Sequence, residues 1–448
     1  MKDTVDLVVR NATLVGSSGR SESDIAIDEQ RFVVVEPRGE LRVRGTTEID
    51  ATGLHALPGV IDGHVHFREP GLEHEETWLT GTRAAVMGGV TTVLDMPNTI
   101  PPTDTVERAV AKLALAQSSA YCDYGIFGLL FDRPNDALQL AGDGLVVGLK
   151  AFMGPTTGSL GPPADDSIRA ALAQPGRRVV FHAEDEWEIE SEIQALPDRI
   201  RNRALGHLAS RTVEAEVMAI DHVGQMVLES RGAGHIAHVS SIDGLTRIEH
   251  WRSRGADLTC EVTPHHLLLD ADVYESFGGL AKVNPPIRSR QQGSALLAAL
   301  AEGRINCLAS DHAPHLLADK QRDSIWDVPA GFAGVETLLP LMLTEVAAGR
   351  LTLERLVQVT SEGPARAWSL WPRKGTVAVG SDADLTLVEL WRGGRVRAAD
   401  LHGLNNHSPF EGRATVGAPV ATIVRGRVAM RDGALVGQPG WGSAVSRA

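Results

Sequence analysis

Two histidines, His64 and His66, end an apolar run in the motif GHVH. Side chains alternate along a strand, so this spacing places both imidazoles on the same face. Further ionisable residues lie at or near the ends of other apolar runs: Lys150, His182, His238 and Asp311. Imidazole and carboxylate groups are suitable ligands for zinc. An H-x-H pair alone is a weak signal, but several run ends of this kind together indicate a metal centre.

Lys150 requires a separate explanation, because an ammonium group cannot bind a metal. A neutral amine can react with carbon dioxide to form a carbamate, which presents two oxygens as a carboxylate does. Two nearby cations would favour the neutral amine and stabilise the resulting anion. A carboxylated Lys150 could therefore bridge two metals. A salt-bridged structural lysine is the alternative that the composition leaves open.

The elements that must position these residues repeat along the chain. Near-continuous apolar runs occur at 59–66, 91–96, 122–130, 145–152, 178–182, 235–239, 257–262 and 305–310, with helical stretches such as 105–118 and 213–230 between most of them. Buried strands that alternate with helices predict an α/β fold, a TIM-type (β/α)8 barrel over residues 56–371. Catalysis in such barrels occurs at the carboxyl ends of the strands, where the candidate ligands would converge.

The two ends of the chain differ from this middle part. Short β-branched runs separated by Gly, Asn, Asp and Ser fill 5–55 and 375–435. Neither half is long enough for a well-buried sheet. We therefore expect residues 1–55 and 372–436 to form one small β-sandwich domain, with the barrel inserted between them. Residues 437–448 are predicted to be a loose tail.

Composition limits the possible partners. The 43 basic and 57 acidic side chains give a net charge of −14, which argues against nucleic-acid binding. Three cysteines without a C-x-x-C pair suit a reducing cytosol. The first residues lack the apolar region of a signal peptide, and no run reaches the ~20 apolar residues of a membrane helix. We expect a cytoplasmic homo-oligomer with a small-molecule substrate and no nucleic-acid or membrane partner.

Longer motifs connect these features to a known family. The specific stretches are PGVIDGHVHFREPG, GGVTTVLDMPNT, GLKAFMG, FHAEDE, AHVSS, EVTPHHLLL, KVNPPIRS and SDHAPH. The sequence resembles the cyclic amidohydrolases, which include dihydroorotase, allantoinase and dihydropyrimidinase, over nearly its whole length. The resemblance implies two Zn²⁺ ions bridged by a carboxylated lysine and a hydroxide. It implies as metal ligands the same six residues: His64, His66, Lys150, His182, His238 and Asp311.

The identity of the substrate ring is indicated by fewer residues than the metal centre is. Arg68 follows His66 by two, Asn98 lies in DMPNT after the second run, and His315 follows Asp311 by four. An arginine with an asparagine and a histidine beside the metals would suit a carboxylate, which dihydroorotate carries and allantoin and hydantoin lack. The H-x-R motif resembles dihydroorotase, in which the matching residues bind the substrate acid, and Asn284 is a further candidate for contact with the ring. A surface or loop-anchoring role is the alternative for Arg68.

GLKAFMG resembles the lysine-bearing, class I branch of the dihydroorotases. DMPNTIPPT also resembles allantoinase, which usually has Leu-Asn where this chain has Asn98-Thr99. The favoured function is therefore dihydroorotase, the reversible hydrolysis of dihydroorotate to N-carbamoyl-aspartate in pyrimidine biosynthesis, with Asp311 as general base and then general acid. Allantoinase is second, followed by hydantoinase or dihydropyrimidinase. A non-catalytic homologue would be expected to lose ligands that are all present here, and a phosphotriesterase-like hydrolase would have no use for Arg68.

Other residues have more than one interpretation. His265 and His266 could orient metal ligands or simply pack. The stretch 154–161 could line the barrel mouth. The stretch 316–334 could cover the mouth as an active-site lid, or it could be a disordered excursion on the surface. The remaining histidines considered are expected to be structural or on the surface: His55, His74, His207, His222, His250, His402 and His407.

Overall fold

The computed structural model describes residues 3–131, 134–156 and 161–445. Eight parallel strands form the barrel in chain order: β6 (Val60–Val65), β7 (Val90–Asp95), β8 (Asp123–Leu129), β9 (Gly148–Phe152), β10 (Arg178–His182), β11 (Ala233–Ile236), β12 (Asp257–Val262) and β13 (Cys307–Leu308). A bridge between Val65 and His312 brings the first strand against the segment after the last one. The predicted barrel is confirmed, and each predicted run overlaps one strand.

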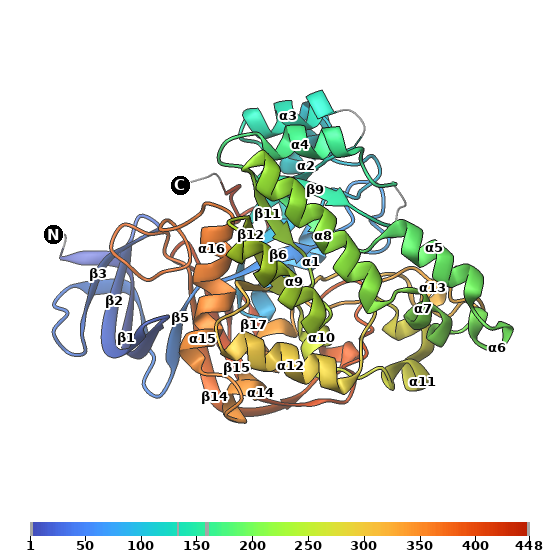
Figure 1. Cartoon of the computed structure of the whole chain (residues 1–448). Helices are drawn as coiled ribbons and strands as arrows, with labels where there is room; N and C mark the ends of the chain where they lie inside the picture. Colours follow the sequence, from blue (N-terminus) through green and yellow to red (C-terminus); the bar gives the residue numbers. More distant parts are fainter. Residues whose placement is uncertain (1–2, 132–133, 157–160, 446–448) are drawn as a thin grey trace.

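Helices cover the outside of the barrel (Figure 1). They are α1 (Trp78–Met87), α2 (Val106–Ser119), α3 (Pro134–Gly142), α4 (Asp165–Leu172), α8 (Val213–Ser230), α9 (Ile242–Ser253), α12 (Arg290–Ala301), α14 (Leu338–Ala347), α15 (Leu353–Val357) and α16 (Gly363–Ala367), with a π-helical turn, η2 (Gln358–Glu362), before the last. The predicted helix at 213–230 coincides with α8, which Thr212 caps by accepting from the Ala215 amide. The other, at 105–118, begins one residue later because Thr105 is the N-cap of α2.

An apolar plug fills the barrel interior below the polar strand ends. Ile61, Leu94, Phe127 and Val180 belong to one buried cluster with Trp368, which follows α16. The strand β6 passes close to this tryptophan, since a Cβ on Gly63 would lie 3.1 Å from Trp368 Nε1. The packed interior leaves the carboxyl ends of the strands as the place where polar groups can gather.

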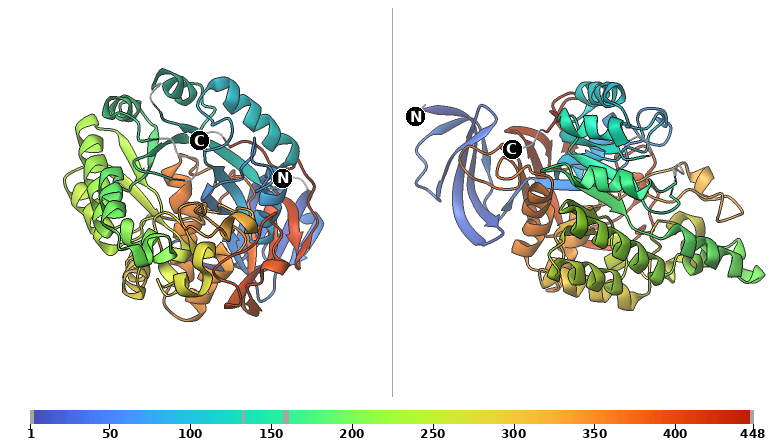
Figure 2. Two further views of the ribbon diagram at one scale, coloured as in Figure 1. Left: turned by 90° about the vertical axis from the view of Figure 1, so that its right-hand side faces the viewer. Right: turned by 45° about the horizontal axis from the view of Figure 1, so that its top comes forward.

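A separate sheet formed by both chain ends lies beside the barrel, where its first three strands stand apart from the helices (Figure 2, right). It contains β1 (Thr4–Gly16), β2 (Gly19–Asp28), β3 (Arg31–Pro37), β4 (Arg44–Asp50), β5 (His55–Pro58), β14 (Leu385–Arg395), β15 (Ala414–Val424), β16 (Arg427–Arg431) and β17 (Ala434–Leu435), with β14 pairing antiparallel to β5. The pairing of the two ends follows the expectation. A short turn, η3 (Ala398–Asp400), lies between β14 and β15.

The expectation of a loose tail at 437–448 is wrong for the described residues up to 445. Gly442 donates to Ala120 O, Ser443 N to Asp123 Oδ1, and Val445 N to Tyr124 O, which places the tail beside β8. Val445 is buried in the cluster that contains Trp368. A Cβ on Gly442 would lie 1.9 Å from Cys122 O, so only glycine permits this close approach. Residues 446–448 lie outside the described part.

Shorter elements surround the barrel mouth: α5 (Glu186–Ala195), α6 (Asp198–Arg201), α7 (Ala204–Ser210), α10 (Pro264–Leu268), α11 (Val273–Phe277), η1 (Gly278–Ala281) and α13 (Leu317–Lys320). Figure 1 shows α5–α7 at the side of the barrel away from the strands β1–β3. Among the described helices, none combines the length and the apolar character needed to cross a bilayer.

Candidate metal centre and substrate pocket

All six predicted ligands line one pocket at the carboxyl ends of the barrel strands: His64, His66, Lys150, His182, His238 and Asp311. His64 lies on β6, Lys150 on β9, and His182 ends β10. His238 lies two residues beyond β11, and Asp311 three residues beyond β13. The structure therefore brings together residues that span most of the chain, as expected from strand ends that meet at one mouth.

One half of the centre is formed by His64, His66 and Asp311. The Nε2 atoms of both histidines lie 3.3 Å from Asp311 Oδ1. One ligand atom from each of the three residues lies within 4.8 Å of the others, a spacing that could hold a metal ion. The carboxylate and the two imidazoles supply the nitrogen and oxygen ligands that zinc accepts.

The other half contains Lys150, His182 and His238. His182 Nδ1 and His238 Nε2 face each other at 3.0 Å. Lys150 Nζ and His238 Nδ1 are buried, and among the described residues neither has a hydrogen-bond partner. Burial lowers the pKa of Lys150 to about 8, which favours the neutral amine that carboxylation needs. Buried polar atoms without protein partners are costly, so these residues fit a metal centre better than a structural network.

The imidazoles are electrostatically suited to ligation. Burial holds the pKa values of His66 and His238 well below the usual value, so both rings are neutral. Burial also lowers the pKa of His64 and His182. For Asp311, burial raises the pKa of the carboxyl group, although His64 and Lys150 oppose the change. Neutral imidazole is the form that binds a metal.

Two carboxylates that orient the histidines were not identified from the sequence. Glu261 Oε1 lies 2.5 Å from His64 Nδ1, and its Oε2 lies 3.1 Å from His235 Nε2. Glu184 Oε2 lies 2.9 Å from His182 Nε2. Acceptors of this kind fix the tautomer of a ligating histidine. A carboxylate between Cys260 and Val262, in the buried half of β12, is a signal that could have identified Glu261, since buried carboxylates need partners.

Backbone conformation also aims the side chains at this site. Arg68, His238 and Asp311 have φ angles of 63°, 35° and 49°. Such left-handed conformations are uncommon for residues other than glycine and often occur at functional sites. Each of the three residues lines the pocket, so the unfavourable backbone positions coincide with candidate functional side chains.

The predicted substrate residues are placed around the same pocket, but with partners. Arg68, Asn98 and Asn284 line it. Asn98 Oδ1 lies 2.7 Å from His66 Nδ1, so it also orients a candidate ligand. Asn284 Oδ1 lies 2.7 Å from Nε2 of His207, a buried residue that we had expected to be structural or on the surface.

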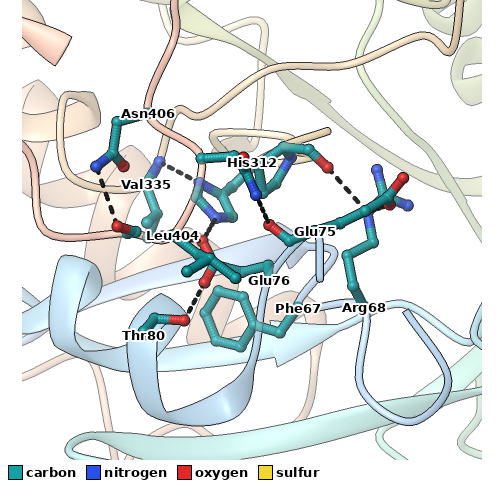
Figure 3. A network of polar contacts seen from close by, with 12 residues as sticks. Phe67, Arg68, Glu75, Glu76, Thr80, His312, Val335, Leu404 and Asn406 are labelled. Carbon is teal, nitrogen blue, oxygen red and sulfur yellow. Dashed lines mark hydrogen bonds and ion pairs between the residues drawn. The ribbon is translucent and has the colours of Figure 1, made fainter. Parts of the chain in front are cut away.

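Arg68 is neither on the surface nor unpaired. It is buried, its Nε lies 3.2 Å from Glu75 Oε2, and its Nη2 lies 3.0 Å from His315 Nε2. His315 is not among the lining residues and lies behind Arg68, with Nδ1 2.9 Å from Glu75 Oε1. Figure 3 shows Arg68 and Glu75 together, with Glu76 and His312 in the adjacent part of the network. Glu75 was not predicted from the sequence.

The remaining predicted motifs lie around the barrel mouth. His266 contacts the Thr263 hydroxyl and Pro285 O, and His265 packs on Phe332, so these contacts do not involve the candidate metal ligands. In the segment 316–334, Ala330 and Gly331 line the pocket, and buried Lys320 donates to Pro329 O and Gly331 O. The segment thus covers the site, while its opening as a lid stays a prediction. Within 154–161, Thr156 lines the pocket and residues 157–160 lie outside the described part.

A second acidic group, Asp123, Asp382 and Asp384, could also be considered for a cation. Lys374 Nζ lies 2.6 Å from Asp123 Oδ2 and Asp384 Oδ2 and 3.2 Å from Asp382 Oδ2. The lysine already supplies the positive charge there, so this cluster is an internal ion network.

Comparison with known proteins agrees with this architecture. The Amidohydrolase family profile matches residues 55–429. A dihydroorotase of Halobacterium salinarum is 39% identical over 94% of this chain and 95% of its own length. An allantoinase of Rubrobacter xylanophilus is 36% identical over 97% of this chain and 96% of its own. The solved structure of the L-hydantoinase (dihydropyrimidinase) from Arthrobacter aurescens superposes with a TM-score of 0.95 at 33% identity, covering 99% of this chain and 100% of that one.

The relatives are named for different cyclic amides, but they share the fold and extend over nearly the whole chain. Together with the six converging residues, these matches support one assignment at the level of the family. The chain belongs to the Amidohydrolase family, within the cyclic amidohydrolase superfamily, and its enzymatic class is that of hydrolases acting on cyclic amides.

Proposed function

We propose that this protein is a dihydroorotase, which hydrolyses the ring amide of dihydroorotate to N-carbamoyl-aspartate and can close the ring in reverse. The observation that carries the proposal is Arg68, a buried guanidinium that lines the same pocket as the candidate metal ligands. A fork of donors at this position suits the ring carboxylate. The identity to curated dihydroorotases supports the same choice.

Two Zn²⁺ ions are the proposed cofactors, with His64, His66, Lys150, His182, His238 and Asp311 as the residues that would hold them. We propose that Lys150 is carboxylated: its neutral amine forms a bond to the carbon of CO2 and loses a proton. When bound, the metals would supply Lewis-acid activation of water and of the ring carbonyl. The partnerless Lys150 Nζ and His238 Nδ1 support this assignment.

The proposed reaction uses Asp311 as the proton carrier. Water forms a bond to the amide carbon and the ring C–N bond breaks, while Asp311 accepts the water proton and returns it to the departing nitrogen. Glu261 keeps His64 in one tautomer, and Asn98 does the same for His66. Arg68 would orient the substrate by binding the carboxylate on the ring. Ala330 and Gly331 would limit the access of bulk water to the pocket.

A neutral ring such as allantoin or hydantoin is the second candidate. The contact between Arg68 and Glu75 favours it, because a guanidinium with an internal counter-ion does not require an anionic substrate. The allantoinase and L-hydantoinase relatives support the same alternative.

Turnover of dihydroorotate, allantoin, hydantoin and dihydrouracil by the zinc-loaded protein tests the proposal. We expect the highest kcat/KM on dihydroorotate. A protein that hydrolyses allantoin or hydantoin well and ignores dihydroorotate would contradict the dihydroorotase assignment and leave the metal centre unaffected.

A further inference from the structure

The group of residues expected to bind a substrate acid already holds an acid of the protein. Glu75 precedes α1 and is buried, with 8% of its surface exposed. Its Oε2 lies 3.2 Å from Arg68 Nε, and its Oε1 accepts a hydrogen bond of 2.9 Å from His315 Nδ1. Two of the residues predicted for the substrate carboxylate, Arg68 and His315, therefore hold the carboxylate of Glu75.

The tautomer of His315 makes this arrangement self-consistent. When Nδ1 donates to Glu75, Nε2 carries a lone pair and can accept from Arg68 Nη2, which lies at 3.0 Å. Burial, with Arg68 nearby, lowers the pKa of His315 to about 4, in agreement with a neutral ring. Burial alone would raise the pKa of Glu75, but His315 and Arg68 outweigh it and hold the pKa below the usual value. Glu75 is therefore a carboxylate at neutral pH.

Glu75 also lies at the boundary between two cavities. It lines an outer pocket, together with His207, Arg211 and Lys282, whereas Arg68 lines the inner pocket of the candidate metal centre. The two pockets share Thr156, Asn284 and Ala330 as lining residues. The Glu75 carboxylate thus faces Arg68 Nε, which also donates to Pro314 O, while Arg68 Nη2 faces His315.

The neighbouring acids have other partners. Glu76 Oε2 accepts from the Leu404 amide and lies 3.4 Å from His312 Nε2. Glu73 is exposed and accepts from the Gly71 amide. Glu69 accepts from the Trp78 amide. Of these four glutamates between β6 and α1, Glu75 is the one in contact with Arg68, and Figure 3 shows the two residues beside each other.

We propose that Glu75 is a specificity-determining residue, whose carboxylate competes with a ring carboxylate for Arg68 and so reduces the preference of the pocket for anionic over neutral rings. Two carboxylates beside one guanidinium repel each other in a buried site, so an anionic ring binds less tightly than Arg68 alone would allow. The inference rests on the proposed function, because it takes Arg68 as the residue that faces the ring substituent.

The test is binding of two planar ring analogues to the zinc-loaded protein by calorimetry: orotate, which is carboxylated, and uracil, which is neutral. Glu75→Gln keeps the size of the side chain and removes its charge. We expect orotate to bind roughly tenfold tighter or more to this variant and uracil to change less than about twofold. Glu73→Gln, which removes the same charge from the same loop, should bind both analogues as the natural protein does.

Unchanged or weaker orotate binding by Glu75→Gln would overturn the inference, and so would an equal change for both analogues, which indicates a purely structural role. Thermal unfolding checks that the variant is folded, and Glu75→Ser provides a second charge-free variant if it is not. Turnover of dihydroorotate by the natural protein separately tests the proposed function. An orotate shift without that turnover removes the dihydroorotase assignment alone, whereas turnover without the shift removes the inference about Glu75.

Discussion

Glu261 provides a sharp test of how the metal centre is organised. Its carboxylate is 1% exposed and contacts two imidazoles, His64 Nδ1 at 2.5 Å and His235 Nε2 at 3.1 Å. Burial alone would raise the pKa of this carboxyl group, but His64 and His235 hold it well below the usual value. The charge is therefore present at neutral pH and accepts from both rings.

Glu261→Gln keeps the shape but can accept from only one ring through its carbonyl oxygen. The amide nitrogen must then face the other imidazole as a donor, so one histidine loses its acceptor. Loss of such an orienting partner weakens metal affinity by ~10–100-fold, which corresponds to ~1.4–2.7 kcal/mol. We expect the variant to lose metal in chelator-buffered titrations and to regain much of its activity in excess zinc.

A matched control separates this effect from the general cost of altering a buried glutamate. Glu345, on α14, is also 1% exposed, but it pairs with Arg350, and neither residue lines the pocket of the candidate metal centre. Glu345→Gln should lower the melting temperature while metal affinity stays unchanged. If Glu261→Gln retained normal metal affinity, or lost no more than Glu345→Gln does, the assignment of Glu261 as the orienting group of His64 would be wrong.

Substitutions of three other residues of the site, and of His402 outside it, have outcomes that can be measured directly. Lys150→Ala should lose at least one metal by elemental analysis and nearly all activity, with partial rescue by a short carboxylic acid; a fully active variant excludes the carbamate. Asp311→Asn should lower turnover by ~100-fold or more in steady-state assays, and normal turnover would move proton transfer to another group. Arg68→Ala should lower kcat/KM on dihydroorotate by roughly 30-fold or more, with partial recovery in Arg68→Lys and a much smaller effect on dihydrouracil. The hydrogen bond to Glu336 raises the pKa of His402 above 6.5. Protonated His402 therefore stabilises the folded protein below pH 6.5, and this contribution is lost as the pH rises through the folded-state pKa. Thermal unfolding of His402→Gln at a series of pH values should lack this loss.

The fold and the candidate ligands could be predicted from the sequence because both depend on local patterns. Apolar runs alternating with helices define a barrel, and the topology of a parallel barrel brings all strand ends to one side. A residue near the end of a run, such as His182 or Asp311, is therefore placed at the mouth without knowledge of its neighbours. The same logic placed Arg68 beside the candidate ligands, because it follows His66 by two residues.

The partners of these side chains were decided only by the tertiary structure. Glu261 lies 197 residues from His64, and His315 lies 247 residues from Arg68, so neither contact has a local sequence signal. The order of the tail at 437–445 has no local sequence signal either, because Gly442, Ser443 and Val445 donate to residues 120–124, more than 300 positions earlier in the chain. Local patterns determine which strand end a residue occupies, whereas the rotation of each strand in the closed barrel determines which acid meets which base. The six candidate ligands could therefore be named from the sequence. The contact between Glu75 and Arg68, which bears most on the choice of substrate ring, could not, because it depends on the path of the irregular loop between β6 and α1.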